Sequence, residues 1–140
     1  MTRWHPYQQA RRLKIEVEHV DSDLGGDLGR WYPDEHKIEL TRGQIHRVER
    51  CVLTHELAHA VLGHPAGDDP KREKQADRWA AMRLIRLDEL RSVARHSPDP
   101  GQWSADLQVT TRLMKVALHI YEGQRHGHRF EVRDSARYAV

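Results

Sequence analysis

The residues of this chain best suited to chemistry lie between positions 55 and 59, which read His-Glu-Leu-Ala-His. In a helix, residues four positions apart lie one turn apart on the same face, so His55 and His59 would point in the same direction. Two neutral imidazoles at this separation can chelate one Zn²⁺. Glu56 would then be placed to activate a water molecule at the metal. The pattern is typical of a metallopeptidase.

The segment around this motif indicates a buried helix. The chain has 11 histidines, and about 0.06 accidental matches are expected at its composition, so the motif needs support from its surroundings. Apolar residues from Ile45 to Leu62 nearly circle the helix axis, which is typical of a helix packed on most sides. Gly63 then supplies a C-terminal stop signal. A metal ion would satisfy two histidines and a glutamate that are otherwise costly to bury.

A third protein ligand is expected from the next segment, because a catalytic zinc site combines three protein ligands with one open position. Pro70 suits the first turn of a second predicted helix, which extends to about Leu87. Glu73 and Asp77 share one stripe of that helix with Ala80, Leu84 and Leu87. We therefore expect Glu73 to be the third ligand and Asp77 to hold a ligand imidazole through its other ring nitrogen. The alternative is a solvated pair of surface carboxylates.

Other residues could enter the site. His64, at the end of the metal-binding helix, is an alternative ligand. His119 is expected on a later helix, either as a core histidine or in the wall of the cleft. Cys51 is expected to be a small core residue. The oxyanion intermediate of peptide hydrolysis would need a hydrogen-bond donor in addition to the metal. Candidates for this donor are Tyr32, His119 and Tyr121.

The paired motifs resemble those of the ImmA/IrrE family of metallopeptidases. In that family a HExxH helix is followed by a helix carrying E-x-x-A-[DN]-x-[FW]-A, and residues 73–80 here read Glu-Lys-Gln-Ala-Asp-Arg-Trp-Ala. The resemblance implies that His55, His59 and Glu73 are the ligands of Zn²⁺ and that Glu56 is the general base. Family members often carry a proline soon after the second motif, which this chain lacks. This departure concerns the path of the chain after the second helix rather than the ligands.

The resemblance also implies a substrate. Family members typically act on a helix-turn-helix repressor, often that of a phage or mobile element, and so switch genes on. The chain is therefore expected to be a zinc-dependent endopeptidase that cleaves a separate helix-turn-helix repressor. The rival hypothesis is a zinc-stabilised, non-proteolytic regulator that binds a repressor or antitoxin partner by contact.

Length and composition favour one zinc metallopeptidase domain over residues 1–140, with 121–140 as a mobile basic tail. A single cysteine rules out an intramolecular disulfide framework and suits a reducing cytosol. No signal-like or membrane-spanning run is present, so a cytoplasmic location without a membrane partner is expected. The net charge of +2 is too small to predict nucleic-acid binding. Basic residues such as Arg42, Arg47 and Arg50 are expected on solvated faces.

The elements predicted around the metal-binding helix give an α+β domain of zincin type. It would have a short antiparallel sheet packed on the central HExxH helix and about three further helices. The predicted strands cover residues 13–18, 28–32 and 36–40, after a short helix over 8–12.

Two further helices are predicted after the Glu73 helix. Asp88 would cap a short helix that extends to residue 96, and the segment Ser97-Pro-Asp-Pro-Gly101 is expected to break the chain. Ser104 would then cap a last helix from Ala105 to about Tyr121. The strand with Ile38 is a candidate sheet edge on which an extended peptide would add as another strand. The alternative is an ordinary edge protected by its charges.

Overall fold

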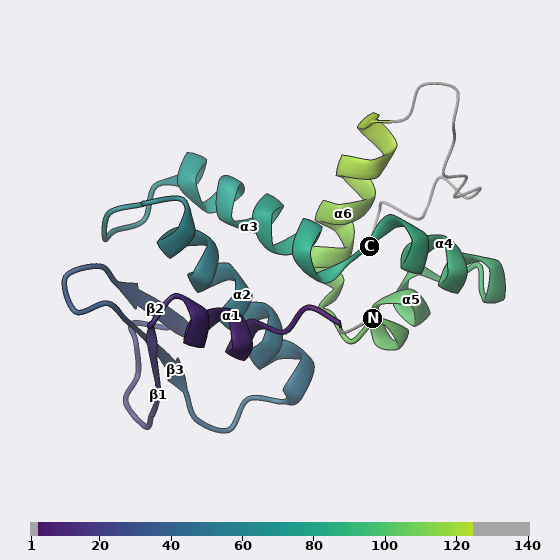
Figure 1. Ribbon diagram of the computed structural model, residues 1–140. Coiled ribbons are helices and arrows are strands. Elements are labelled where there is room, and N and C mark those ends of the chain that lie inside the picture. The colour runs from purple at the N-terminus through teal and green to yellow at the C-terminus, as the bar shows by residue number, and fades with distance from the viewer. Residues whose placement is uncertain (1–2, 125–140) are drawn as a thin grey trace.

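The computed structural model describes residues 3–124. Residues 125–140, most of the predicted tail, lie outside the described residues. Figure 1 shows the strands at one end of the molecule, α4 and α5 at the other, and α2 and α3 between them. The elements in chain order are α1 (Pro6–Arg12), β1 (Glu16–Val20), β2 (Gly29–Tyr32), β3 (Lys37–Thr41), α2 (His46–Val61), α3 (Pro70–Leu84), α4 (Leu87–His96), α5 (Pro100–Asp106) and α6 (Thr111–Gln124).

The three strands form one mixed sheet in the order β1-β3-β2. β2 and β3 form the predicted hairpin and are antiparallel, whereas β1 pairs with β3 in parallel. The α+β class is confirmed, but an antiparallel sheet was correct only for the hairpin. Ile38 and Leu40 of β3 are fully buried because this strand has a neighbour on each side. The prediction that the Ile38 strand is an edge was therefore wrong, and β2 is an edge instead.

The helix α2 packs between the sheet and α3, so it is covered on two sides as its apolar pattern predicted. Leu53 and Leu57 are fully buried in a cluster with Ile38 and Leu40 of the sheet. Toward α3, fully buried alanines leave room for the two helix backbones to approach closely. These alanines are Ala58, Ala76 and Ala80.

The second helix, α3, starts as predicted and ends earlier. Asp69 caps it by accepting a hydrogen bond from the backbone N–H of Lys71, and Pro70 occupies the first position. Ile85 then adopts an extended conformation (φ −126°, ψ 101°), and Leu87 starts α4. Leu87 therefore does not belong to the stripe that carries Glu73 and Asp77.

Two helix starts were predicted wrongly. Arg86 rather than Asp88 is the N-cap residue of α4, and Asp88 lies in its first turn. Ser104 lies inside α5, where it is buried and its hydroxyl donates to the carbonyl of Pro100. Pro100, read from the sequence as a break, is the first residue of α5, and Asp99 caps it. The last helix, α6, starts only at Thr111.

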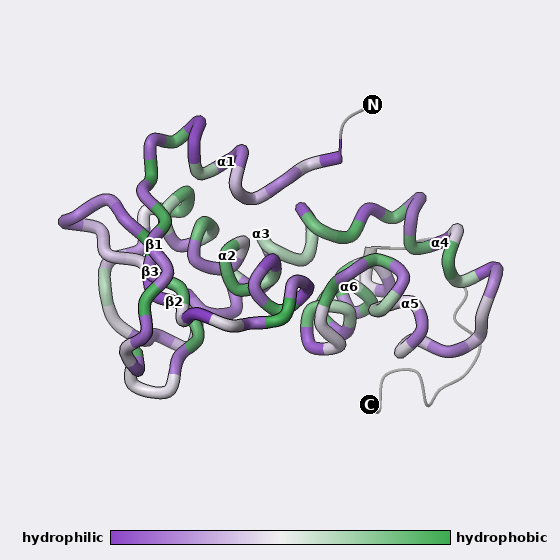
Figure 2. The backbone as a smooth tube through the Cα atoms, turned by 90° about the horizontal axis from the view of Figure 1, so that it is seen from below, coloured by the Kyte–Doolittle hydropathy of each residue, from purple (hydrophilic) through white to green (hydrophobic). Residues whose placement is uncertain are grey.

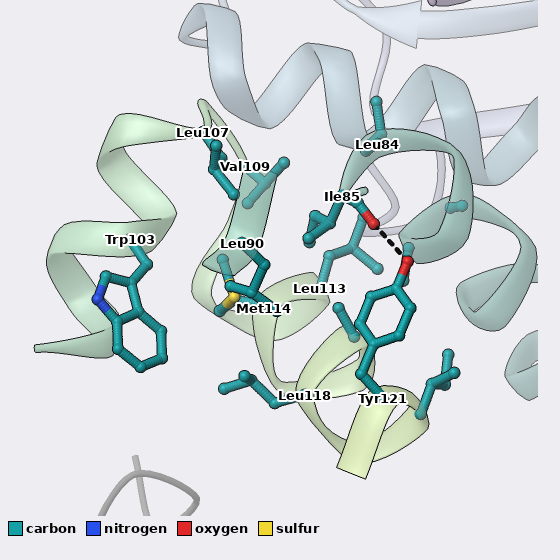
Figure 3. Close-up of a cluster of buried hydrophobic side chains, with 14 of the residues drawn as sticks. Leu84, Ile85, Leu90, Trp103, Leu107, Val109, Leu113, Met114, Leu118 and Tyr121 are labelled. Atoms are coloured by element: carbon teal, nitrogen blue, oxygen red, sulfur yellow. Dashed lines mark hydrogen bonds between the residues drawn. The ribbon is translucent and has the colours of Figure 1, made fainter. Parts of the chain in front are cut away.

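The helices from α3 to α6 enclose a second apolar cluster, shown in Figure 3. Trp103, Met114 and Leu118 are among its largest buried side chains. Arg50 of α2 reaches its margin, where the guanidinium donates to the carbonyls of Leu107 (3.2 Å) and Gln108 (2.7 Å). Arg50 is 8% exposed, so its prediction as a solvated residue was wrong.

Figure 2 shows hydrophobic and hydrophilic positions interleaved along the helices. None of the helices among residues 3–124 is long and apolar enough to span a membrane.

Candidate metal centre

Three of the predicted site residues converge between α2 and α3. His55 and His59 lie one turn apart on α2, and their Nε2 atoms are 3.1 Å apart. The carboxylate of Glu73, in the first turn of α3, lies against both rings. Its Oε1 is 3.0 Å from Nε2 of His55, and its Oε2 is 2.8 Å from Nε2 of His59.

These three side chains fit a divalent metal ion. Ligand atoms about 2.1 Å from a tetrahedral zinc ion lie about 3.4 Å from one another, and the three groups here offer ligand atoms within 4.8 Å of one another. Both imidazoles direct Nε2 into the group, because each Nδ1 faces another partner. Two nitrogen lone pairs facing each other at 3.1 Å need a proton or a cation between them. The role of these residues as ligands stays a prediction that the geometry suits.

His55 is supported by charged residues behind it. Its Nδ1 is 2.9 Å from Oδ1 of Asp77, as the sequence predicted for Asp77. Burial would lower the pKa of His55, but the hydrogen bond to Asp77 and the nearby carboxylates outweigh burial and raise it. Burial would likewise raise the pKa of Asp77, but its contacts with His55 and Arg112 lower it.

Arg112 is a site residue that the sequence reasoning missed. Its guanidinium donates to Oδ2 of Asp77 at 2.7 Å. Arg112 lies in the first turn of α6, 35 positions after Asp77. No local pattern joins the two residues, and the predicted helix from Ala105 to Tyr121 placed Arg112 in its interior, so no sequence signal pointed to it. Its side chain is 63% exposed and faces the cleft.

His59 is supported differently, by an imidazole and, behind that, an amide. Its Nδ1 lies 2.9 Å from Nδ1 of His64, and Nε2 of His64 lies 2.9 Å from Oε1 of Gln75. Burial and the positive charge of His55 lower the pKa of His59. Both ring nitrogens of His64 are thus engaged away from the three-residue group, which argues against its alternative assignment as a ligand.

Glu56 lies beside the group and turns toward the sheet. Burial raises the pKa of its carboxyl to about 7, and a backbone hydrogen bond from Trp31 of β2 opposes part of this rise. A carboxylate with a pKa near neutrality can both take up and release a proton at physiological pH. This property suits the general-base role that the sequence predicted for Glu56.

The group opens into a cleft of about 750 Å³. Its walls come from β2, α2, the segment 65–68 and the start of α6. Gly29 allows β2 to lie close to α2, because a Cβ atom there would come within 2.6 Å of Cγ1 of Val52. An alanine at this position would push the strand away from the helix.

The three candidate oxyanion donors lie in different places. Tyr32 lines the cleft. Tyr121 is buried in the helical cluster and donates to the carbonyl of Ile85 at 2.8 Å, as Figure 3 shows. His119 is exposed on α6 and does not line the cleft, so neither reading of it was correct. Cys51 is buried, as predicted.

Comparison with known families gives one match. Residues 10–119 match the family model Peptidase_M78, described as the IrrE N-terminal-like domain. The matched region contains both motif helices and Arg112. A search among curated proteins found no matching relative.

Proposed function

Since the chain belongs to the IrrE N-terminal-like peptidase family, Peptidase_M78, we propose that it is a zinc-dependent endopeptidase that cleaves a separate helix-turn-helix repressor in the cytoplasm. The observation that carries this proposal is the convergence of the Nε2 atoms of His55 and His59 with the Glu73 carboxylate, all within 4.8 Å. Glu56 adds a buried carboxyl beside them whose pKa is raised to about 7. The repressor itself is proposed from the family resemblance.

In this mechanism His55, His59 and Glu73 hold the metal and Glu56 moves the proton. Zn²⁺ bound there would lower the pKa of a water molecule toward about 7 and polarise the scissile carbonyl. Glu56 takes one proton from the attacking water as the oxygen bonds to the carbonyl carbon. It then gives that proton to the nitrogen of the breaking C–N bond, which leaves as the amine.

The substrate would bind along β2. This strand is an edge of the sheet, and all four of its residues line the cleft. An extended peptide added there gains main-chain hydrogen bonds and lies across the opening of the metal group. The peptide-addition hypothesis made for the Ile38 strand thus moves to β2.

The test compares Glu56→Gln with wild-type protein loaded with zinc. The substitution preserves size and removes the base, so zinc content should stay near one ion per chain while repressor cleavage falls by about 10²- to 10⁴-fold. Mass spectrometry of the repressor fragments and metal analysis are the measurements. Cleavage at the wild-type rate would reject Glu56 as the base.

The same variant separates cleavage from regulation by contact. If Glu56→Gln still relieved repression in cells as well as wild type, a non-proteolytic regulator would explain the function, and the endopeptidase proposal would fail.

A further inference from the structure

A second pocket, of about 610 Å³, is lined by α1 and by the residues just before it. It shares no lining residue with the cleft beside the metal group. Its walls are basic, since three of the lining side chains are arginines and none is a carboxylate. The lining residues are Arg3, Trp4, His5, Gln8, Arg11 and Arg12, and all of them except Trp4 are exposed.

Two guanidinium groups meet at one carbonyl oxygen beside this pocket. Nη2 of Arg3 and Nη1 of Arg50 both donate to the carbonyl of Leu107, at 3.0 Å and 3.2 Å. Arg50 is only 8% exposed, and a buried charge is normally paired with an opposite one. Within residues 3–124, however, neither Arg50 nor any arginine of the pocket forms an ion pair with a carboxylate. The arginines that do are Arg30, Arg42, Arg72, Arg86 and Arg112.

The pKa values of the nearby groups reflect this excess of positive charge. Burial lowers the pKa of Arg50, and the charge of Arg3 lowers it further. Burial also lowers the pKa of His5, with further contributions from Arg50 and His46. A negatively charged group placed among these side chains would be attracted by all of them.

The backbone that carries Arg3 and His5 is held in place by the residue between them. Trp4 packs against both apolar clusters. Its ring meets that of Trp79 edge to face, with the centroids 6.0 Å apart, and its indole N–H donates to Oε1 of Gln9 at 3.3 Å. The basic side chains therefore project from an anchored backbone, which reduces the entropy that a partner must remove on binding.

The positive region is small because carboxylates border it. α1 packs on β1, which carries Glu16 and Glu18, and Glu89 of α4 acts on Arg50 from another side. Duplex DNA needs a longer run of cations to follow its phosphates. The ring of Trp4 is engaged in packing, so it offers no free platform for a base of single-stranded nucleic acid.

We propose that Arg3, Arg11 and Arg12 form a docking surface for a short acidic segment of a protein partner. Carboxylates can pair with guanidinium groups through two parallel hydrogen bonds, which suits arginine better than lysine. Residues 125–140 of the chain itself hold four arginines and two acidic residues, so their net charge has the same sign as the surface. The occupant is therefore a different protein. This docking requires neither the metal nor cleavage.

The test measures binding of a fluorescein-labelled hexaglutamate peptide to the full-length protein by fluorescence anisotropy at low ionic strength. Each exposed ion pair contributes up to about a 5-fold change in affinity, so the double variant Arg11→Gln/Arg12→Gln should bind about 5- to 20-fold more weakly. Both positions are exposed and glutamine is a good helix former, so the variant should fold. No binding of the peptide by wild type up to about 1 mM would overturn the proposal.

The matched control is Lys74→Gln/Arg78→Gln, which also removes two positive charges from exposed positions of a helix. It should bind the peptide as wild type does. Equal weakening by the two double variants would show that only net charge matters, and the proposal would fail.

Two further comparisons identify the occupant and its place. A labelled mixed-sequence oligonucleotide, single-stranded or duplex, should bind more weakly than the peptide at the same salt concentration. Tighter binding that Arg11→Gln/Arg12→Gln weakens would make the surface a nucleic-acid site and overturn the proposal. Zinc-loaded and zinc-free protein should bind the peptide equally, whereas binding that requires zinc would place the peptide in the cleft instead. Because cleavage is not measured, a failed search for a substrate would count against the proposed function only.

Discussion

The sheet region (residues 3–69) and the helical region (residues 70–124) use their buried residues differently. In the sheet region a small apolar cluster supports α2, which carries His55, Glu56 and His59. The helical region has the larger apolar cluster. The polar side chains that this region adds to the site lie outside that cluster. These contributions are Glu73, Gln75, Asp77 and Arg112.

This difference shows that the candidate metal centre lies at the boundary between the two regions. The sheet region alone supplies two imidazoles and a base, without a third ligand. The helical region supplies Glu73 as the expected third ligand, Asp77 against His55 and Gln75 against His64, while its interior contributes stability. Substitutions at the boundary should therefore change zinc affinity, whereas substitutions in the helical interior should change the free energy of unfolding.

The largest effect is expected from Glu73→Ala, which removes the one ligand supplied by the helical region. We expect zinc affinity to fall by more than about 100-fold, beyond the range for a residue that only supports a ligand. The protein should stay folded, because the Glu73 side chain lies at the surface end of α3 and is 38% exposed. Metal analysis after gel filtration measures the loss, and Lys74→Ala is the exposed neighbouring control. Stoichiometric zinc in Glu73→Ala would place the third ligand elsewhere.

The opposite result, a loss of stability without a change in zinc binding, is expected from Leu118→Ala in the helical interior. Leu118 is fully buried, and a Leu→Ala change at such a site costs about 2–5 kcal/mol of unfolding free energy. Zinc stoichiometry of the folded protein should not change, because Leu118 does not line the cleft. Urea unfolding of metal-free protein measures the cost, with exposed Lys115→Ala of the same helix as the control. A cost below about 1 kcal/mol would mean that the cluster contributes less than its burial implies.

A smaller effect is expected from Arg112→Ala, which cuts the link between α6 and the site. Asp77 would keep its contact with His55 but lose the partner on its other oxygen. We expect zinc affinity to fall about 10-fold and stability to change by less than about 1 kcal/mol, because Arg112 is mostly exposed. Chelator competition and urea unfolding give the two values. If stability fell while zinc affinity did not, the role of Arg112 would be to hold the two regions together rather than to support the site.

The smallest expected effect is a displacement of the pH dependence of zinc binding. The pKa of metal-free His55 is raised above its ordinary value, so protons compete with zinc as pH falls through that raised pKa. Asp77→Asn removes the charge that supports the protonated ring. The pKa of His55 should then fall, and the loss of zinc affinity should move to lower pH. Zinc affinity measured across a pH series tests the sign, and a displacement to higher pH would contradict it.

The local parts of the site followed from the sequence. The spacing of His55 and His59 fixes their common helix face whatever surrounds the helix, because a turn contains 3.6 residues. The same reasoning placed Glu73 and Asp77 on one face of α3, where both contact His55. The family resemblance also depended on these local motifs, and the family match confirmed it.

The predictions for the sheet were wrong because they required a choice between strand partners that are distant along the chain. Alternation of apolar residues predicts a strand, but the path of residues 21–28 decides that β1 reaches the far side of β3. For the same reason the edge beside the cleft proved to be β2. The break between α5 and α6 was missed because the start signal at Asp99 and Pro100 was read as a loop.

The sequence by itself thus determined which side chains the HExxH helix presents on one face, because neighbours in a helix are neighbours along the chain. Only the tertiary structure decided what lies behind each imidazole. The contact of His64 with His59 is local, since the two residues are five positions apart. Asp77 and Arg112 behind His55, and Gln75 behind His64, come from segments separated along the chain. Their contacts exist because α3 and α6 pack where they do, and packing is set by the whole fold rather than by local spacing.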